Sequence, residues 1–379
     1  MFDATPSDLA RYAVRPLLPG PLDVLREAVL ALGVGPSALP MIAERGVVEA
    51  IALQGLGSDQ TRVLEREIHK LGGELLVNEG ADRAVLLGSL SALGMLPMRL
   101  TEWGQATEAL GAAIHAAVIG KGMAPPPLTL GDHVLRFGER TLVMGIVAAP
   151  DDAALGGATV EHALRLVADG ADLICIVDPR RADRADDPDA WAADRADLAG
   201  LIGQTVAEGN VPVGIESASP ALVAAAVTAG AAVVTWHPGG PTDIAAAVGA
   251  AAHAALLIAN TERPAAVADR MATACIDLRE ALAAAAAVGA DPARVLVDPG
   301  LGGGAAPGAS SPTMIRRLGE LRGLARPIVI TPTGATPEGT IALAVLGAHL
   351  GADIVRVHDV IGVRRALDAA DAISRDQDR

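Results

Sequence analysis

Lysine and aromatic residues are scarce in this chain of 379 residues. Lys70 and Lys121 are the only lysines, and the aromatic residues are three Trp, two Phe and one Tyr. A formal net charge of −15 leaves no basic surface to gather phosphates, and so few rings provide no platform for stacked bases. The composition therefore excludes nucleic acid as a partner and argues against binding to an anionic membrane surface.

Cysteine and long apolar runs are also missing. Cys175 and Cys275 are too few and too far apart for a disulfide framework or a zinc site. No stretch of about 18 to 20 residues is free of polar residues, as a membrane span requires. The first residues lack the basic head and apolar block of a secretory signal. We expect a soluble cytoplasmic protein that has no membrane partner.

Short apolar, β-branched runs alternate with Ala/Leu-rich helical patterns from about residue 141 onward. The runs are TLVMGIVAA, ADLICIVD, VPVGIES, AAVVTWH, ALLIAN, RVLVDPG, PIVITPTG and DIVRVHD. Near-continuous apolar runs of this kind are typical of strands that are covered on both faces. Eight such units over roughly 240 residues predict a (β/α)8 TIM barrel. A doubly wound open sheet is the alternative, but no GxGxxG motif follows the first strand.

A small N-terminal α/β domain is predicted over residues 1–118, before the barrel domain at 128–379. Its strands are expected at 47–55, 73–78 and 83–89, and its helices at 59–72 and 103–118. Residues 119–127 form a linker, because consecutive prolines cannot continue a helix. The segment 128–143 has a strand–turn–strand pattern and is expected to close the bottom of the barrel. We interpret His69 and His115 as surface residues of predicted helices.

Polar residues gather where the predicted strands end, which is where a barrel of this kind carries its active site. Arg356 and His358 alternate along the last strand, so both are expected to point into the barrel mouth. A guanidinium beside an imidazole suits an anion such as phosphate or carboxylate. The alternative is that Arg356 forms an ion pair with Glu216 or Asp298 inside the mouth.

Two carboxylates and an amide end three other predicted strands. Glu216, Asn260 and Asp298 can match the donor and acceptor edge of a flat heterocycle. The glycines that follow Asp298, in VDPGLGGG, let the backbone approach a ligand closely, or they merely form a flexible loop. Both interpretations of this loop remain open.

Two further groups of residues at strand ends are less informative. Arg180 and Arg181 begin a long charged stretch after the second strand, most of which is expected to be solvated. His237 stands next to Trp236 and could be a ligand, a stacking partner or core filler, and we expect core filler or a residue at the rim.

Several of these segments resemble dihydropteroate synthase, an enzyme family of folate biosynthesis. The most specific are LTLGDHVLRFGERTLVMGIV, GADLI, VDPGLG and GADIVRVHDVIGVRRALDAADAI. VLEREIHKLGGELLVNEG, followed by AVLLGS, is similar to the N-terminal extension of some bacterial members. The resemblance implies a homodimeric barrel that joins a pterin pyrophosphate to para-aminobenzoate, with Mg²⁺ assisting.

The resemblance also assigns roles to individual residues of the barrel mouth. Asp298 matches the aspartate that holds the pterin, and Arg356 and His358 match the pair that binds the anion. Glu216 stands where the family has a shorter aspartate. Arg180 or Arg181 could make the contacts of the loop after the second strand.

Other family positions have changed, and most of them belong to the catalytic machinery. The asparagine that helps to hold the metal and pyrophosphate is replaced by Ala148, and the asparagine of the fourth strand by Thr235. The family's Ser-Arg-Lys on the seventh strand is replaced by a segment without Arg or Lys, and the barrel contains no lysine at all. We therefore assign no catalytic residue, and the metal ligands remain unknown.

We interpret the chain as a synthase-like pseudoenzyme that binds a pterin or another small anion without full synthase activity. A divergent but active synthase is the first alternative, with Asn260 or Thr235 taking over the amide contacts. A pterin-dependent methyltransferase-like protein is another, although it would need a corrinoid-protein partner. The last alternative is a non-catalytic subunit that pairs with a true synthase.

Overall fold

The computed structural model describes residues 48–78, 83–122, 124–148, 157–178, 190–240, 243–251, 253–260, 270–301 and 312–374. The chain divides into two compact units, Met1–Ile119 and Gly120–Arg379. Within the described residues, no helix combines the length and the apolar character that crossing a membrane would need.

The first unit contains a three-stranded antiparallel sheet with the strand order β1-β3-β2. Its strands and helices are β1 (Val48–Gln54), α4 (Ser58–Lys70), β2 (Glu74–Val77), β3 (Arg83–Ser89), α5 (Leu90–Thr101) and α6 (Gln105–Gly122). Buried and exposed residues alternate along β3, because one face of the sheet packs against helices. The core includes Leu64, Ile68, Leu86 and Leu93. The predicted strands are confirmed, and His69 and His115 are exposed as expected.

Helix α5 is the element of this unit that the sequence analysis missed. It contains Pro97, which argues against a helix interior. The side chains of Leu93, Leu96 and Leu100 nevertheless form a buried stripe, and the hydroxyl oxygen of Ser89 accepts a hydrogen bond from the first turn. Burial of this stripe outweighs the cost of the proline.

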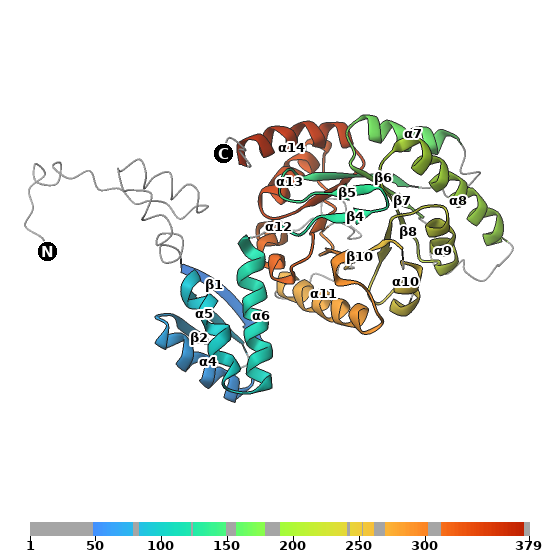
Figure 1. Cartoon of the computed structure of the whole chain (residues 1–379). Coiled ribbons are helices and arrows are strands. Elements are labelled where there is room, and N and C mark those ends of the chain that lie inside the picture. The colour runs from blue at the N-terminus through green and yellow to red at the C-terminus, as the bar shows by residue number, and fades with distance from the viewer. Residues whose placement is uncertain are drawn as a thin grey trace, which may run out of the picture. The chain divides into compact units, whose positions relative to one another are not determined.

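Eight parallel strands form the second unit (Figure 1). They are β6 (Leu142–Ala148), β7 (Leu173–Val177), β8 (Val213–Glu216), β9 (Val233–Trp236), β10 (Ala255–Ala259), β11 (Val295–Asp298), β12 (Val329–Ile330) and β13 (Ile354–Val357). Their order is β11-β10-β9-β8-β7-β6-β13-β12, and a parallel bridge from Val297 to Ile328 joins the two ends. The ring is therefore closed, which confirms the (β/α)8 barrel and excludes the open sheet.

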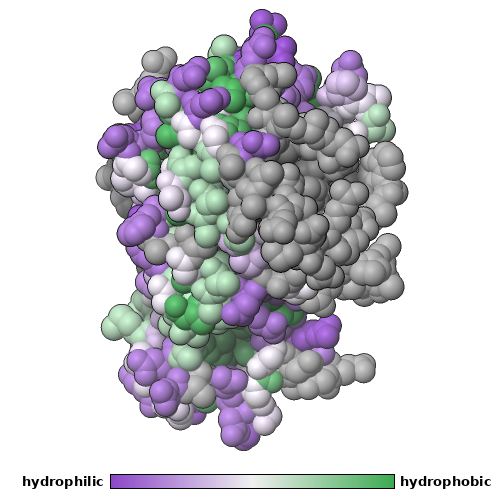
Figure 2. All heavy atoms as spheres, turned by 90° about the vertical axis from the view of Figure 1, so that its right-hand side faces the viewer, coloured by the Kyte–Doolittle hydropathy of each residue, from purple (hydrophilic) through white to green (hydrophobic). Residues whose placement is uncertain are grey.

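Helices surround this ring on the outside (Figure 1). They are α7 (Gly157–Ala168), α8 (Ala190–Gly209), α9 (Pro220–Thr228), α10 (Ile244–Ala250), α11 (Arg270–Ala287), α12 (Pro312–Arg316), α13 (Pro337–His349) and α14 (Val360–Ser374), with short 3₁₀ helices at Pro292–Arg294 and Leu318–Leu324. Figure 2 shows a band of hydrophobic residues bordered by hydrophilic ones on the side of the molecule that lies to the right in Figure 1.

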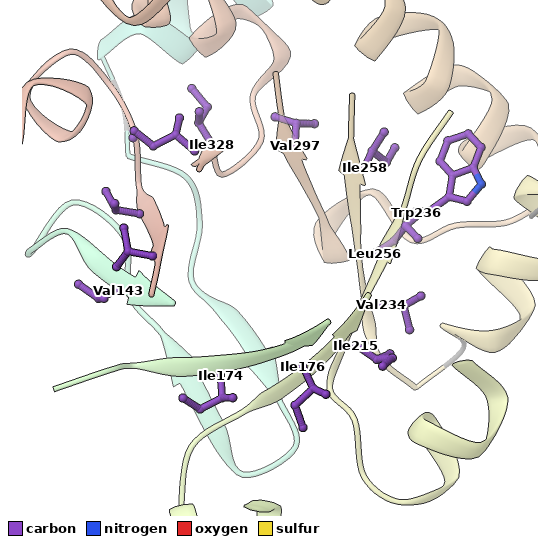
Figure 3. Packing of buried hydrophobic residues seen from close by; sticks show 14 of the residues in the cluster. Val143, Ile174, Ile176, Ile215, Val234, Trp236, Leu256, Ile258, Val297 and Ile328 are labelled. Atoms are coloured by element: carbon purple, nitrogen blue, oxygen red, sulfur yellow. The ribbon is translucent and has the colours of Figure 1, made fainter. Parts of the chain in front are cut away.

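Side chains on the barrel strands alternate between two apolar layers. One set, which includes Val143, Ile174, Ile215 and Val297, points away from the ring of strands and packs against the helices (Figure 3). The other set points inward and includes Met144, Cys175, Val233, Leu257, Leu296, Val329 and Ile354. This alternation decides which residues at the strand ends enter the barrel mouth.

A β-hairpin closes the bottom of the barrel, as the sequence predicted. It consists of β4 (Leu128–Leu130) and β5 (His133–Leu135), joined by a turn at Gly131, whose φ of 59° suits glycine. Leu128, Leu130, Leu135 and Phe137 belong to the same buried cluster as the inward-facing strand residues. The barrel is therefore filled from below by apolar side chains.

Two Gly-Ala-Asp motifs also lie at the bottom of the barrel, just before β7 and β13. Oδ2 of Asp172 accepts a hydrogen bond from the N–H of Val143 at 2.8 Å, and Oδ2 of Asp353 accepts one from Ile328 at 2.8 Å. Arg322 binds Asp353 through two further hydrogen bonds of 3.0 and 2.9 Å. These two motifs thus connect neighbouring strands and lie away from the mouth.

Candidate ligand site at the barrel mouth

Polar residues continue the inward-facing positions of several strands toward the mouth. Along β9 and just beyond its end, Thr235 and then His237 follow the inward-facing Val233 at intervals of two residues. At the same spacing, Asp298 follows Leu296 on β11, and Arg356 follows Ile354 on β13. Glu216 ends β8. Because side chains alternate along a strand, these polar groups lie directly above the apolar inner layer.

Arg356, Glu216 and His237 form one connected network in the mouth. The Arg356 side chain is only 8% exposed, and its Nη2 donates a hydrogen bond to Oε2 of Glu216. The other carboxylate oxygen, Oε1, lies 3.1 Å from Nε2 of His237. Nδ1 of His237 lies 3.0 Å from the carbonyl oxygen of Ala259. Both oxygens of Glu216 therefore have partners within the protein.

This network changes the ionisation of its members. Burial opposes ionisation of Glu216, but the hydrogen bond from His237 and the charge of Arg356 outweigh it and lower the pKa of Glu216 to about 2. Burial likewise opposes protonation of His237, yet its hydrogen bond to Glu216 raises the pKa of the imidazole above its ordinary value. Glu216 is therefore ionised at neutral pH.

Asp298 occupies another side of the mouth, where it is 4% exposed. Its Oδ1 accepts a hydrogen bond from the N–H of Gly300 at 2.7 Å, and its Oδ2 accepts one from the hydroxyl of Thr331 at 3.2 Å. Burial raises the pKa of Asp298, although both hydrogen bonds oppose that effect. Asn260 is its neighbour, since the Asn260 N–H donates to the Asp298 carbonyl oxygen at 2.9 Å.

Cys175 lies in the inward-facing layer beneath this network and is fully buried. Burial raises the pKa of its thiol to about 11, although the charge of Arg356 opposes that shift. The thiol is therefore protonated at neutral pH, and Cys175 does not supply a nucleophile.

Arg356 and His358, which the sequence predicted to act as a pair, differ in burial. Arg356 is buried within β13, whereas His358 follows the strand and is exposed. The burial that His358 does have, together with the charge of Arg356, lowers the pKa of its imidazole. At neutral pH the positive charge at this strand end thus comes from Arg356. Its ion pair with Glu216, the alternative interpretation of the sequence, is present.

His237 has defined contacts in the structure, whereas the sequence left a ligand, a stacking pair, core filler and a rim residue open. Trp236 points outward into the apolar layer beneath the helices (Figure 3), which leaves His237 facing inward toward Glu216. The two-residue periodicity from Val233 through Thr235 to His237 was the signal that could have revealed this.

The described residues do not include the predicted loop arginines, and they lack the metal contact that the resemblance implies. Arg180 and Arg181 lie outside the described residues. Ala148 ends β6 and has no side-chain oxygen to offer a metal ion, and within the described ranges no group of three or more His, Cys, Asp or Glu residues is arranged to hold one. The described residues therefore do not fit Mg²⁺ in the manner that the resemblance implies.

Comparison with known families identifies the barrel. The model of the pterin binding enzyme family matches residues 155–358, which is more than half of the 379 residues. This chain belongs to the pterin binding enzyme family. Dihydropteroate synthase of Bacillus subtilis (strain 168) is 28% identical to this family member over 264 residues, covering 63% of this chain and 90% of that protein.

Two more relatives of this chain are dihydropteroate synthases. The enzyme of Synechocystis sp. (strain ATCC 27184 / PCC 6803 / Kazusa) is 28% identical over 293 residues, covering 66% of this chain and 96% of that protein. A solved structure of the Xanthomonas albilineans enzyme in complex with 7,8-dihydropteroate is 28% identical, with a TM-score of 0.55. That match covers 65% of this chain and 98% of the solved one.

Proposed function

We propose that this family member binds a pterin pyrophosphate or another small anion at its barrel mouth without full synthase activity. One observation carries the proposal. Asp298 and Arg356, at the positions that the resemblance assigns to pterin and anion binding, are both buried at the same end of the barrel. A carboxylate has about four acceptor positions, and the two hydrogen bonds to Asp298 leave room for the N–H groups of a heterocycle.

Substitutions around these two residues argue against full activity. Thr235 and Ala148 stand where the resemblance implies two asparagines, and the segment TPTGATPEG after β12 has neither the arginine nor the lysine that the resemblance implies there. Losing one donor in such a site costs roughly 1 to 3 kcal/mol. Several losses together would raise the barrier by roughly 5 kcal/mol, which slows the reaction by a factor of several thousand.

Calorimetric titration with 6-hydroxymethyl-7,8-dihydropterin pyrophosphate, with and without Mg²⁺, tests the binding. We expect saturable binding that falls at least about tenfold in Arg356→Lys, because a lysine cannot reproduce the fork of guanidinium donors. Arg365→Ala, which removes an exposed arginine of α14, is the matched control and should bind like the unmodified protein. The absence of heat at millimolar ligand would exclude a pterin pyrophosphate.

A turnover assay with para-aminobenzoate separates the pseudoenzyme from an active synthase. Binding without formation of dihydropteroate is the expected result. Turnover at a rate typical of enzymes, about 1 s⁻¹ or faster, would instead show that the substituted residues still support the full reaction.

A further inference from the structure

His237 has hydrogen-bond acceptors at both nitrogens of its ring. The carbonyl oxygen of Ala259, 3.0 Å from Nδ1, can only accept a hydrogen bond. Oε1 of Glu216, 3.1 Å from Nε2, belongs to a carboxylate whose second oxygen already receives a hydrogen bond from Arg356. Satisfying both contacts requires a proton on each ring nitrogen, which is the imidazolium form.

Two charged groups act on the imidazole of His237, the carboxylate of Glu216 and the guanidinium of Arg356. Glu216 on β8 is ionised, Arg356 on β13 is positive, and the thiol of Cys175 on β7 is neutral. Asp298 on β11 is bound by Gly300 and Thr331, and burial shifts it toward the neutral form. An imidazolium at position 237 thus places two cations, His237 and Arg356, against the carboxylate of Glu216.

Arg356 also has a hydrogen-bond donor without a partner among the described residues. This donor is Nε, which is buried. A buried donor without a partner is costly, and a bound acceptor would satisfy it.

We propose that His237 is a positioning residue, which as an imidazolium holds Glu216 on Arg356 and adds a positive charge to the mouth for an anionic ligand group. The inference deepens the proposed function, on which it rests for the location of the anion. If His237 loses its proton, Glu216 alone neutralises Arg356, and the attraction for a second anion falls. Anion affinity should therefore fall as the pH rises through the pKa of His237.

Titration with sulfate between about pH 6 and about pH 9 tests this charge directly, because sulfate keeps its own charge throughout this range, whereas His237 becomes neutral once the pH rises above its raised pKa. We expect the affinity to fall about tenfold across this range in the unmodified protein. His237→Gln can still donate to Glu216 but carries no charge, so it should bind weakly at every pH. His253→Gln changes an exposed histidine and should retain the full pH profile. Arg356→Lys identifies binding at the mouth by weakening it.

The ¹⁵N NMR spectrum of the imidazoles reports the proton itself, without any ligand. The chain has eight histidines, and the signals lost in His237→Gln identify those of His237. We expect both its nitrogens to be protonated at neutral pH. A neutral ring at that pH, a flat sulfate profile in the unmodified protein, or no sulfate binding would each overturn the inference. Loss of pterin binding with these results intact would instead overturn the proposed function alone.

Discussion

Arg356 and Glu216 form an ion pair across the barrel mouth, although 140 residues separate them in the sequence. The guanidinium is 8% exposed and the carboxylate 20%, so both charges have lost much of their hydration. Such a pair contributes little net stability, but removing one partner leaves the other charge buried without compensation.

A double-mutant cycle measures this relationship. We expect Arg356→Met to lower the free energy of unfolding by about 3 kcal/mol, because Glu216 then keeps only His237 as a partner. The double variant with Glu216→Gln should recover part of this loss, with a coupling energy of about 1 to 3 kcal/mol from urea unfolding curves. Additive effects of the two substitutions would show that the ion pair does not form.

Acid should lower the free energy of unfolding, because Glu216 becomes protonated. Its pKa of about 2 in the folded chain lies below the ordinary value, so its contribution to stability is complete above about pH 4.3. This contribution is lost as the pH falls from there toward 2. Urea unfolding curves at about pH 5 and about pH 3 measure this loss. Between these two pH values, we expect the free energy of unfolding to fall by about 2 kcal/mol less in Glu216→Gln than in the unmodified chain. Glu320→Gln, at an exposed carboxylate that pairs with Arg317, should behave like the unmodified chain.

Ionisation of Asp298 should destabilise the folded chain, whereas ionisation of Glu216 stabilises it. Burial raises the pKa of Asp298, so the ionised form destabilises the folded chain at neutral pH. Asp298→Asn can still accept the hydrogen bond from Gly300, and we expect it to unfold at equal or higher urea concentration at pH 7. Calorimetry should show that it binds the pterin pyrophosphate at least about tenfold more weakly. Clear destabilisation, or unchanged binding, would contradict the role assigned to Asp298.

Asp353 should be needed for stability rather than for ligand binding. It is 3% exposed and connects Arg322 with the backbone of Ile328 at the bottom of the barrel. Asp353→Ala removes these hydrogen bonds, and we expect a loss of about 3 kcal/mol in the free energy of unfolding. Asp132→Ala, at an exposed position of the hairpin turn, should change stability by less than about 0.5 kcal/mol.

The resemblance implies a homodimer, and substitutions of exposed apolar residues on α13 and α14 test whether these helices form its interface. Leu346 of α13 is 51% exposed and Ile373 of α14 is 84% exposed, and these two helices pack against each other. Sedimentation should show a dimer that Leu346→Glu dissociates, because a charge is costly within an apolar interface. Ile276→Glu, on α11, should leave the dimer intact. A monomer at micromolar concentration in the unmodified protein would refute the prediction.

The sequence was sufficient for the barrel and for part of its mouth. Eight apolar runs separated by helical patterns allow few arrangements, because each strand must be covered on both faces. Residues at the ends of parallel strands, such as Glu216, Asp298 and Arg356, must then meet at one end of the ring. GADLI and GADIVRVHDVIGVRRALDAADAI were among the segments that indicated the family, but only the structure showed that their aspartates, Asp172 and Asp353, connect strands at the bottom of the barrel.

Which polar groups contact one another was decided by the tertiary structure alone. The ion pair of Arg356 with Glu216, and the inward turn of His237, depend on the register and closure of strands that are distant in the sequence. The shifted pKa values follow from the same contacts, since burial and neighbouring charges exist only once the ring has closed. Local sequence patterns determine which elements form, whereas the charges in the mouth depend on how those elements come together.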